Sequence, residues 1–250
     1  MNFSKKIKTE LCAYSVEACR VVARLGVNRV ELCASPAEGG VTPSYATIER
    51  VSKIEGLDLS VMIRPRGGDF LYSDEEFQTM LADIDYARQA GATGVVFGVL
   101  TADGRVDVER TRQLVERAEG LETTFHRAVD MTENYVEAVE AVIAAGCKRI
   151  LTSGGYDKAI DGIDNIARAV ERAAGRIEIM AGSGVVATNA AALASTGVDA
   201  LHFSAKRMVL GGMEYRNPRI SMGGTASVDE FSLRIVDEEE VTKILTLIRE

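Results

Sequence analysis

Apolar residues recur along this chain in four copies of one short pattern. In each copy a helical stretch ends at a small residue and a glycine, a spacer follows, and an apolar run comes next; the copies occupy residues 25–32, 90–97, 145–152 and 196–203. A glycine can adopt the left-handed backbone conformation that closes a helix, so the chain can turn directly into a strand. Each copy therefore predicts a helix followed by a buried strand.

Further strand candidates lie between these copies, at residues 8–12, 59–63, 122–126 and 177–181. The combined set is eight strands. Their separation of roughly 20 to 35 residues is typical of βα units that close into a barrel. The pattern predicts an α/β fold of the TIM (β/α)8 barrel type.

A single domain accommodates the whole chain of 250 residues, because no Pro/Ser-rich linker divides it. We expect the barrel to span about residues 8–205 and an irregular C-terminal extension to span about 206–250. Residues 204–224 are rich in glycine, methionine and polar residues without a clear period, and helix signals return at 237–248. The extension is expected to wrap the barrel or to contribute to a subunit interface.

Polar residues at the predicted helix starts support this layout. Ser73 and Glu76 have the spacing of a capping box, in which each side chain accepts a hydrogen bond from the other residue's backbone N–H. Ser15, Ser44 and Asp107 are plausible caps for three more helices. Residues 101–106 have the composition of a tight turn after the fourth strand.

The net charge of −8 argues against nucleic acid and anionic membranes as partners, because both attract a basic surface. The first eight residues carry charge but no long apolar stretch follows them, and no run of membrane-spanning length occurs anywhere. The four cysteines show neither CxxC spacing nor the density of a secreted scaffold. We therefore expect a cytoplasmic protein with reduced thiols.

The first two predicted strands end in the same three residues, Glu-Leu-Cys, at positions 10–12 and 31–33. Ligand sites in TIM barrels lie at the C-terminal ends of the strands. Side chains alternate across a strand, so Leu11 and Leu32 suit the helix layer and both carboxylates and both thiols point toward the barrel axis. Glu10, Glu31, Cys12 and Cys33 are therefore candidate site residues.

Other strand ends also carry charged side chains. The third ends in Arg64 and Arg66, and the fifth ends near His126, Arg127 and Asp130. Arginine binds carboxylate or phosphate in a bidentate manner, and histidine or a carboxylate can transfer a proton. The hypothesis of an enzyme assigns catalytic roles to Glu10, Glu31, Arg64, His126 and Asp130.

Small hydrogen-bond donors follow the later strands. Loops after strands seven and eight of TIM barrels often bind phosphate through backbone N–H groups. The candidate anion-binding residues are Arg66, Arg127, Ser153, Gly154, Gly182, Ser183, Gly184, His202 and Ser204. Glycine and serine also form ordinary βα turns, the charges could pair in a structural network, and His202 could be a core residue; these alternatives remain open.

Cys12 and Cys33 lie at matching positions on strands that should be neighbours, about 5 Å apart. Soft thiolates select Cu(I), for which two sulfurs suffice. Free cysteines are also often buried as small hydrophobic residues, and this is the interpretation we favour for Cys19 and Cys147. The spacing alone leaves both roles open for the strand-end pair.

Several of these motifs together resemble the CutC family, named for copper homeostasis. The resemblance rests on residues 9–12, 31–35, 38–44, 62–70 with 72–73, 124–128 and 151–154, and it extends into the tail at 215–217. The run Ile63-Arg64-Pro65-Arg66-Gly67-Gly68-Asp69-Phe70 is long and unusual, and Val129 departs from the family's usual phenylalanine. The resemblance implies a TIM barrel, an oligomer that is commonly a dimer, and a copper site at Cys12 and Cys33.

Two functional hypotheses follow. The first is a copper homeostasis protein that binds Cu(I) through the two thiolates. The second is an enzyme that performs acid–base chemistry on a small phosphorylated or carboxylate substrate at the barrel mouth. The methionine- and glycine-rich stretch 208–222 is more apolar than a free tail requires, so we also expect a homodimer.

Overall fold

Eight parallel strands close into a barrel in the computed structural model, which describes residues 6–217, 219–220 and 230–249. Each strand pairs with the next, and β8 pairs with β1 to complete the circle. The strands are β1 Lys8–Ala13, β2 Arg29–Leu32, β3 Asp58–Met62, β4 Gly94–Phe97, β5 Glu122–Phe125, β6 Arg149–Thr152, β7 Glu178–Gly182 and β8 Ala200–Phe203. The predicted TIM barrel is confirmed.

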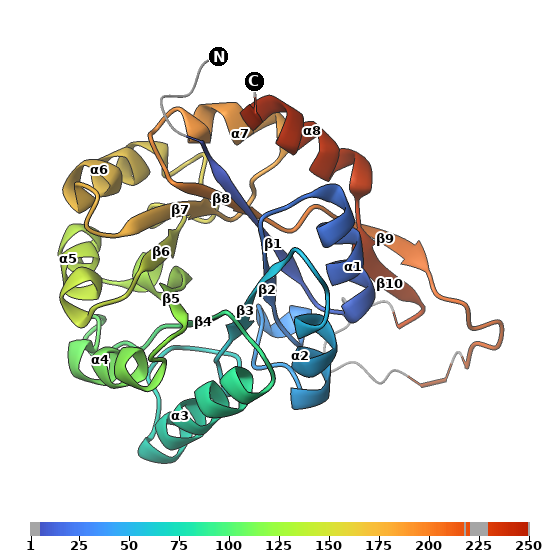
Figure 1. The fold of residues 1–250 in the computed structure, drawn as a ribbon, viewed down its shortest axis with the longest axis horizontal. Helices are drawn as coiled ribbons and strands as arrows, with labels where there is room; N and C mark the ends of the chain where they lie inside the picture. Colours follow the sequence, from blue (N-terminus) through green and yellow to red (C-terminus); the bar gives the residue numbers. More distant parts are fainter. Residues whose placement is uncertain (1–5, 218, 221–229, 250) are drawn as a thin grey trace.

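Helices form an outer ring around the strands (Figure 1). They are α1 Val16–Leu25, α2 Tyr45–Ser52, α3 Asp74–Gln89, α4 Val108–Arg117, α5 Tyr135–Ala145, α6 Ile163–Ala173, α7 Ala187–Ala194 and α8 Glu238–Arg249. Two short 3-10 helices, η1 Pro36–Glu38 and η2 Arg127–Met131, follow β2 and β5. None of the helices in the described part of the chain is long and apolar enough to cross a membrane.

The local signals for helix starts and ends are confirmed. Gly26 and Gly146 close α1 and α5 in the left-handed conformation, with φ of 75° and 91°. The capping box of Ser73 and Glu76 is formed at α3. The side chains of Ser15, Ser44 and Asp107 also cap their helices, and the turn at 101–106 is closed by a backbone bridge between Leu100 and Val106.

Apolar side chains fill the space between the strands and the helix ring. Leu11, Leu32 and Phe125 are fully buried there. The inside of the barrel is more polar, because Glu10 pairs with Arg29 and the buried Arg149 pairs with Glu178. A charged interior needs such pairing, since an unpaired buried charge is costly.

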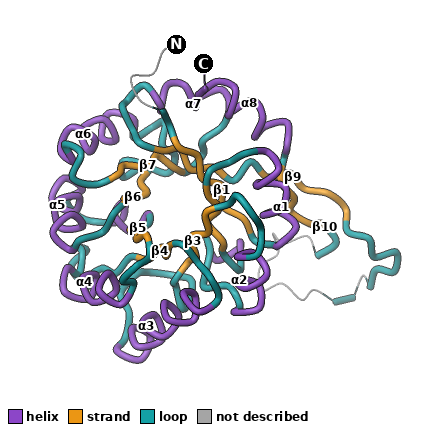
Figure 2. Tube along the Cα trace, in the orientation of Figure 1, coloured by secondary structure: helices purple, strands orange, loops and turns teal. Residues whose placement is uncertain are grey.

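Part of the C-terminal extension forms an antiparallel ribbon of β9 Lys206–Leu210 and β10 Ser232–Val236. Figures 1 and 2 show it projecting beside α1, outside the barrel. Strand β9 has no alternation of polar and apolar residues, so its sequence does not predict a strand. Strand β9 forms because β10 pairs with it through backbone hydrogen bonds. Residues 221–229, which include Met222 of the predicted interface, lie outside the described residues.

Candidate functional site

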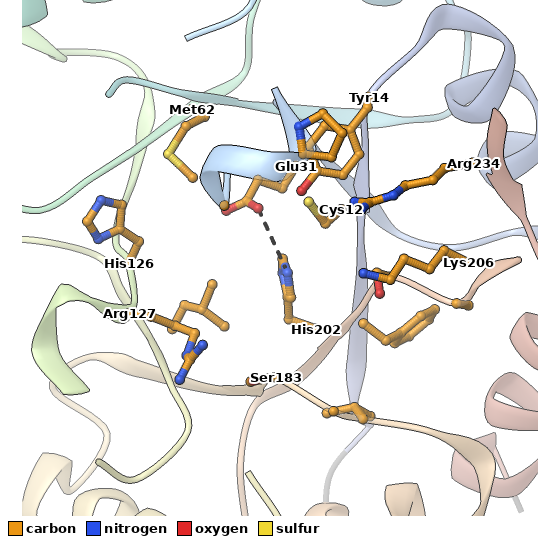
Figure 3. Close-up of a pocket in the computed structure, with 18 of the residues that line it drawn as sticks. Cys12, Tyr14, Glu31, Met62, His126, Arg127, Ser183, His202, Lys206 and Arg234 are labelled. Atoms are coloured by element: carbon orange, nitrogen blue, oxygen red, sulfur yellow. Dashed lines mark ion pairs between the residues drawn. The ribbon is translucent and has the colours of Figure 1, made fainter. Parts of the chain in front are cut away.

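A cavity of about 900 Å³ opens at the C-terminal mouth of the barrel, where the sequence places the site. Its walls come from strand ends, from the loops after β2 and β7, and from the β9–β10 ribbon. The residues that line it include Cys12, Tyr14, Glu31, Met62, Arg64, Phe70, His126, Arg127, His202, Lys206 and Arg234, and all of these except Arg64 and Phe70 are labelled in Figure 3.

The two strand-end thiols meet beside this cavity. Cys12 Sγ lies 3.9 Å from Cys33 Sγ, and Cys33 Sγ lies 3.5 Å from Glu31 Oε2. Hydrogen bonding from Cys33, aided by His202, lowers the pKa of the Cys12 thiol well below its ordinary value. Leu11 and Leu32 point into the helix layer, so the predicted orientation of both Glu-Leu-Cys segments is confirmed.

His202 lies between the two glutamates of these segments. Its Nδ1 is 2.7 Å from Glu10 Oε1, and its Nε2 is 3.8 Å from Glu31 Oε2. Burial alone would raise the pKa of Glu10, but Arg29 and His202 together lower it to about 2. Burial alone would lower the pKa of His202, but Glu31, Cys12 and Glu10 raise it well above its ordinary value.

Unlike Glu10, Glu31 has no arginine partner among the residues that the structure describes. Burial raises the pKa of Glu31 well above its ordinary value. Its Oε1 is buried without a hydrogen-bond partner among the described residues. Glu10, His202 and Glu31 thus form a row with unequal proton affinities, as acid–base chemistry requires; catalytic roles for the two glutamates and anion binding by His202 stay predictions.

Two glycines make room for the histidines. A Cβ on Gly98 would lie 2.6 Å from the ring of His126, and a Cβ on Gly182 would lie 3.1 Å from Cβ of His202. Gly182 is therefore required for packing in the structure, whatever part it has in binding an anion. The local sequence around either glycine does not indicate which histidine the glycine contacts.

His126 lines the wall of the cavity opposite Cys12 in Figure 3. Its Nδ1 accepts a hydrogen bond from the backbone N–H of Ala128, so the neutral ring carries its proton on Nε2. Burial, with repulsion from Arg64 and Arg127, lowers the pKa of His126 to about 3. The ring of Phe70 packs against it at a centroid distance of 4.9 Å.

The arginines after β3 are held by the protein itself. Arg64 donates hydrogen bonds to the carbonyl oxygens of Glu38, Gly40 and Gly68, which joins the loop after β2 to the loop after β3. Arg66 pairs with Glu76 and Asp69 and lies outside the cavity lining. Anion binding by either residue stays a prediction, and it would require these contacts to be exchanged.

Asp130 organises the loop after β6. Its carboxylate accepts hydrogen bonds from Thr152, from the backbone and hydroxyl of Ser153 and from the backbone of Gly155. Arg127 pairs with Asp130 and also donates to Ser153. Three predicted site residues are thus brought together, but in a network that holds a loop; Arg127 alone of them lines the cavity.

The remaining anion candidates divide between the cavity and the loops. Ser183, Gly184 and Ser204 line the cavity. Gly154 packs against Gly162, where a Cβ would come within 2.3 Å of a carbonyl oxygen. At the first turn of α7, the backbone N–H of Ala187 donates to Glu240 at 2.7 Å, so a carboxylate of the protein's own occupies that donor.

The sequence interpretation missed several cavity residues, among them Tyr14, Lys206 and Arg234. Tyr14 lies two residues beyond Cys12, so strand alternation could have indicated it. Lys206 and Arg234 reach the cavity through the ribbon, whose two strands are far apart in sequence. No local pattern could have placed these two.

Among the described residues, two groups of side chains have ligand atoms close enough to share a metal ion. One is Cys12, Glu31 and Cys33, and the other is Glu10, Glu31 and His202, with the ligand atoms of each group within 4.8 Å of one another. The first offers two soft sulfurs and the second offers oxygen and nitrogen. Glu10 of the second group is already paired with Arg29, so the first is the better candidate.

Comparison with known proteins gives one consistent family. Residues 7–207 match the model of the CutC family. The chain is 48% identical to a CutC family protein of Bacteroides fragilis, over 93% of each chain, and 42% identical to the human copper homeostasis protein cutC homolog, over 95% of this chain and 86% of that one. A solved CutC structure from Streptococcus agalactiae superposes with a TM-score of 0.75 at 36% identity, covering 79% of this chain and 98% of that chain.

Proposed function

Because the chain belongs to the CutC family, we propose that it serves copper homeostasis by binding Cu(I) through the thiolates of Cys12 and Cys33. The observation that carries this proposal is the separation of 3.9 Å between the two sulfurs. A metal–sulfur bond of about 2.3 Å, as for zinc, lets one ion reach both sulfurs without moving a strand. Soft sulfur donors favour Cu(I) over the harder ions of the cell.

The surroundings support a deprotonated sulfur at this position. The hydrogen bond between the two sulfurs lowers the pKa of the Cys12 thiol and raises the pKa of the Cys33 thiol, so Cys12 carries the thiolate and Cys33 keeps its proton until copper displaces it. Glu31 completes the donor group, and its buried Oε1 lacks a partner within the described structure. The other two cysteines are buried, and burial raises the pKa of the Cys19 and Cys147 thiols to about 12.

The test is a competition titration of the reduced protein against a Cu(I) chelator. Cys12→Ser or Cys33→Ser removes half of the sulfur donors, so we expect each to weaken Cu(I) binding at least tenfold, about 1.4 kcal/mol. Cys147→Ala is the matched control, because this buried thiol lies away from the cavity lining, and it should leave the affinity unchanged. Equal affinity in the wild type and the double serine variant would exclude this site.

The same proposal includes a cytoplasmic homodimer. All four cysteines are free thiols, which suits a reducing compartment. Exposed apolar residues on the β9–β10 ribbon support self-association.

A further inference from the structure

Two basic side chains at the cavity have no partner in the described part of the chain. Four basic residues line it: Arg64, Arg127, Lys206 and Arg234. Arg64 is bound to carbonyl oxygens and Arg127 is paired with Asp130. Within residues 6–217, 219–220 and 230–249, the side chains of Lys206 and Arg234 make no ion pair or hydrogen bond.

The ribbon presents these two cations on one face. Lys206 pairs with Val236 and Arg234 pairs with Met208, so alternation places Lys206 and Arg234 on the same side, and Arg207 on the other. Figure 3 shows both side chains extending into the cavity from the side on which Cys12 and Tyr14 lie. A protein of net charge −8 thus has two available positive charges beside its thiol pair.

Two acidic residues that line the cavity together with Lys206 and Arg234, Asp237 and Glu240, are already engaged elsewhere. Asp237 accepts a hydrogen bond from the backbone of Glu240 at the start of α8, and Glu240 accepts one from the backbone of Ala187. Neither forms an ion pair with Lys206 or Arg234 in the described structure. The two cations are therefore free to bind an anion that enters from outside.

The cavity is also much larger than a metal ion requires. At about 900 Å³ it has the size of a small-molecule site. A single ion held by two sulfurs fills a small part of that space. The cavity therefore has room for an organic molecule, and the free cations give the charge that this molecule should carry.

We propose that Cu(I) reaches this site as a complex with an anionic low-molecular-weight thiol, whose carboxylates bind Lys206 and Arg234 while its copper passes to Cys12 and Cys33. This inference rests on the proposed Cu(I) site and names the form in which copper arrives. A positive charge at the mouth attracts such a complex and orients its sulfur toward the protein thiols.

The transfer is a ligand exchange that needs no oxidant or reductant. A bond forms between Cys12 Sγ and copper as the bond between copper and the donor sulfur breaks, and copper remains Cu(I) throughout. Because Cys12 reacts as a thiolate, the donor sulfur that it displaces leaves as a thiolate and takes a proton from water. When Cys33 displaces a second donor sulfur, the proton of its thiol passes to that departing sulfur.

The experiment measures the rate of copper transfer to the reduced, metal-free protein by stopped flow from two donors. One is the Cu(I) complex of glutathione, which is anionic, and the other is the Cu(I) complex of 2-mercaptoethanol, which lacks carboxylates. In the variant Lys206→Met/Arg234→Met we expect transfer from glutathione to slow about tenfold, and transfer from 2-mercaptoethanol to stay within about twofold. The difference between the wild type and this variant in the rate of transfer from glutathione should decrease as added salt screens the charges.

Arg207→Met is the matched control, because it removes a cation from the opposite face of the same strand. It should transfer copper from both donors at the wild-type rate. If the double variant slows copper transfer equally from both donors, or does not slow it at all, the role of Lys206 and Arg234 is wrong. Either result leaves the proposed copper site unaffected. Failure of the wild type to take copper from either donor would instead contradict the proposed function.

Discussion

His126 illustrates how one buried side chain depends on groups from several strands. Gly98, directly after β4, leaves space for its ring, Phe70 packs against the ring, and the backbone N–H of Ala128 donates to Nδ1. The residue is only 5% exposed, so the charged form of its ring would lose its hydration without gaining an acceptor. The histidine therefore stays neutral in the folded protein.

This residue should make the protein sensitive to acid. The pKa of His126 is lowered to about 3, so between its ordinary value of 6.5 and that value the unfolded chain binds a proton that the folded chain does not. The free energy of unfolding should therefore fall as the pH falls, by about 2 kcal/mol between pH 6.5 and pH 5 from this residue alone.

Urea unfolding of the wild type and His126→Gln at both pH values measures this contribution. Between pH 6.5 and pH 5, the free energy of unfolding of the variant should fall by about 2 kcal/mol less than that of the wild type, whatever its value at pH 6.5. Phe70→Leu is the control, because it alters the packing of the same ring without removing the titrating group. Parallel losses in the wild type and His126→Gln would show that the ring is protonated in the folded state.

At the scale of elements, the pairing of β1 with β2 sets the geometry of the thiols. Cys12 lies opposite Glu31, so Cys33 lies two residues farther along its strand than the position paired with Cys12. Strands are about 4.8 Å apart and rise about 3.3 Å per residue, which gives a Cα separation of about 8 Å. This is beyond the roughly 7 Å that a disulfide spans, although the two sulfurs lie 3.9 Å apart.

The register therefore predicts that the pair resists disulfide formation. On treatment of the folded protein with diamide, Cys12 and Cys33 should stay reactive toward a thiol-specific alkylating reagent after the oxidant is removed, as judged by mass spectrometry of peptides. The same protein unfolded in urea is the control, since its free chain can form the bridge. Rapid bridging in the folded state would mean that the strands move relative to each other.

On the scale of the whole molecule, the β9–β10 ribbon exposes apolar side chains that a monomer would leave in contact with water. A two-stranded ribbon alone is only marginally stable in water. Met208, Leu210 and Leu233 on its strands are 54%, 72% and 56% exposed, and Met213 and Tyr215 beyond β9 are more than half exposed. Exposed apolar groups gathered in one region are typical of an interface.

We expect the protein to form a homodimer through this region, the commonest form of closed self-association. Light scattering at micromolar concentration should give the mass of two chains, and Leu210→Glu should shift it toward that of one, because a buried charge without a partner opposes association. Met131→Glu is the control, since Met131 is 69% exposed on η2, at the other side of the barrel. A monomeric wild type would contradict the prediction.

Local sequence patterns were enough to predict the barrel and the direction of its strand-end side chains. Helix-closing glycines and the alternation of Glu10, Leu11 and Cys12 act through neighbouring residues, so they can be interpreted from a short segment. The tertiary structure alone decided which charges are engaged and which are free. Arg64 and Asp130 have the residue types of a binding site, yet loop groups far away in the chain occupy their hydrogen bonds, whereas Lys206 and Arg234 reach the cavity only because β10 pairs with β9. The availability of a charged side chain depends on its partners in space, and the order of residues along the chain does not specify them.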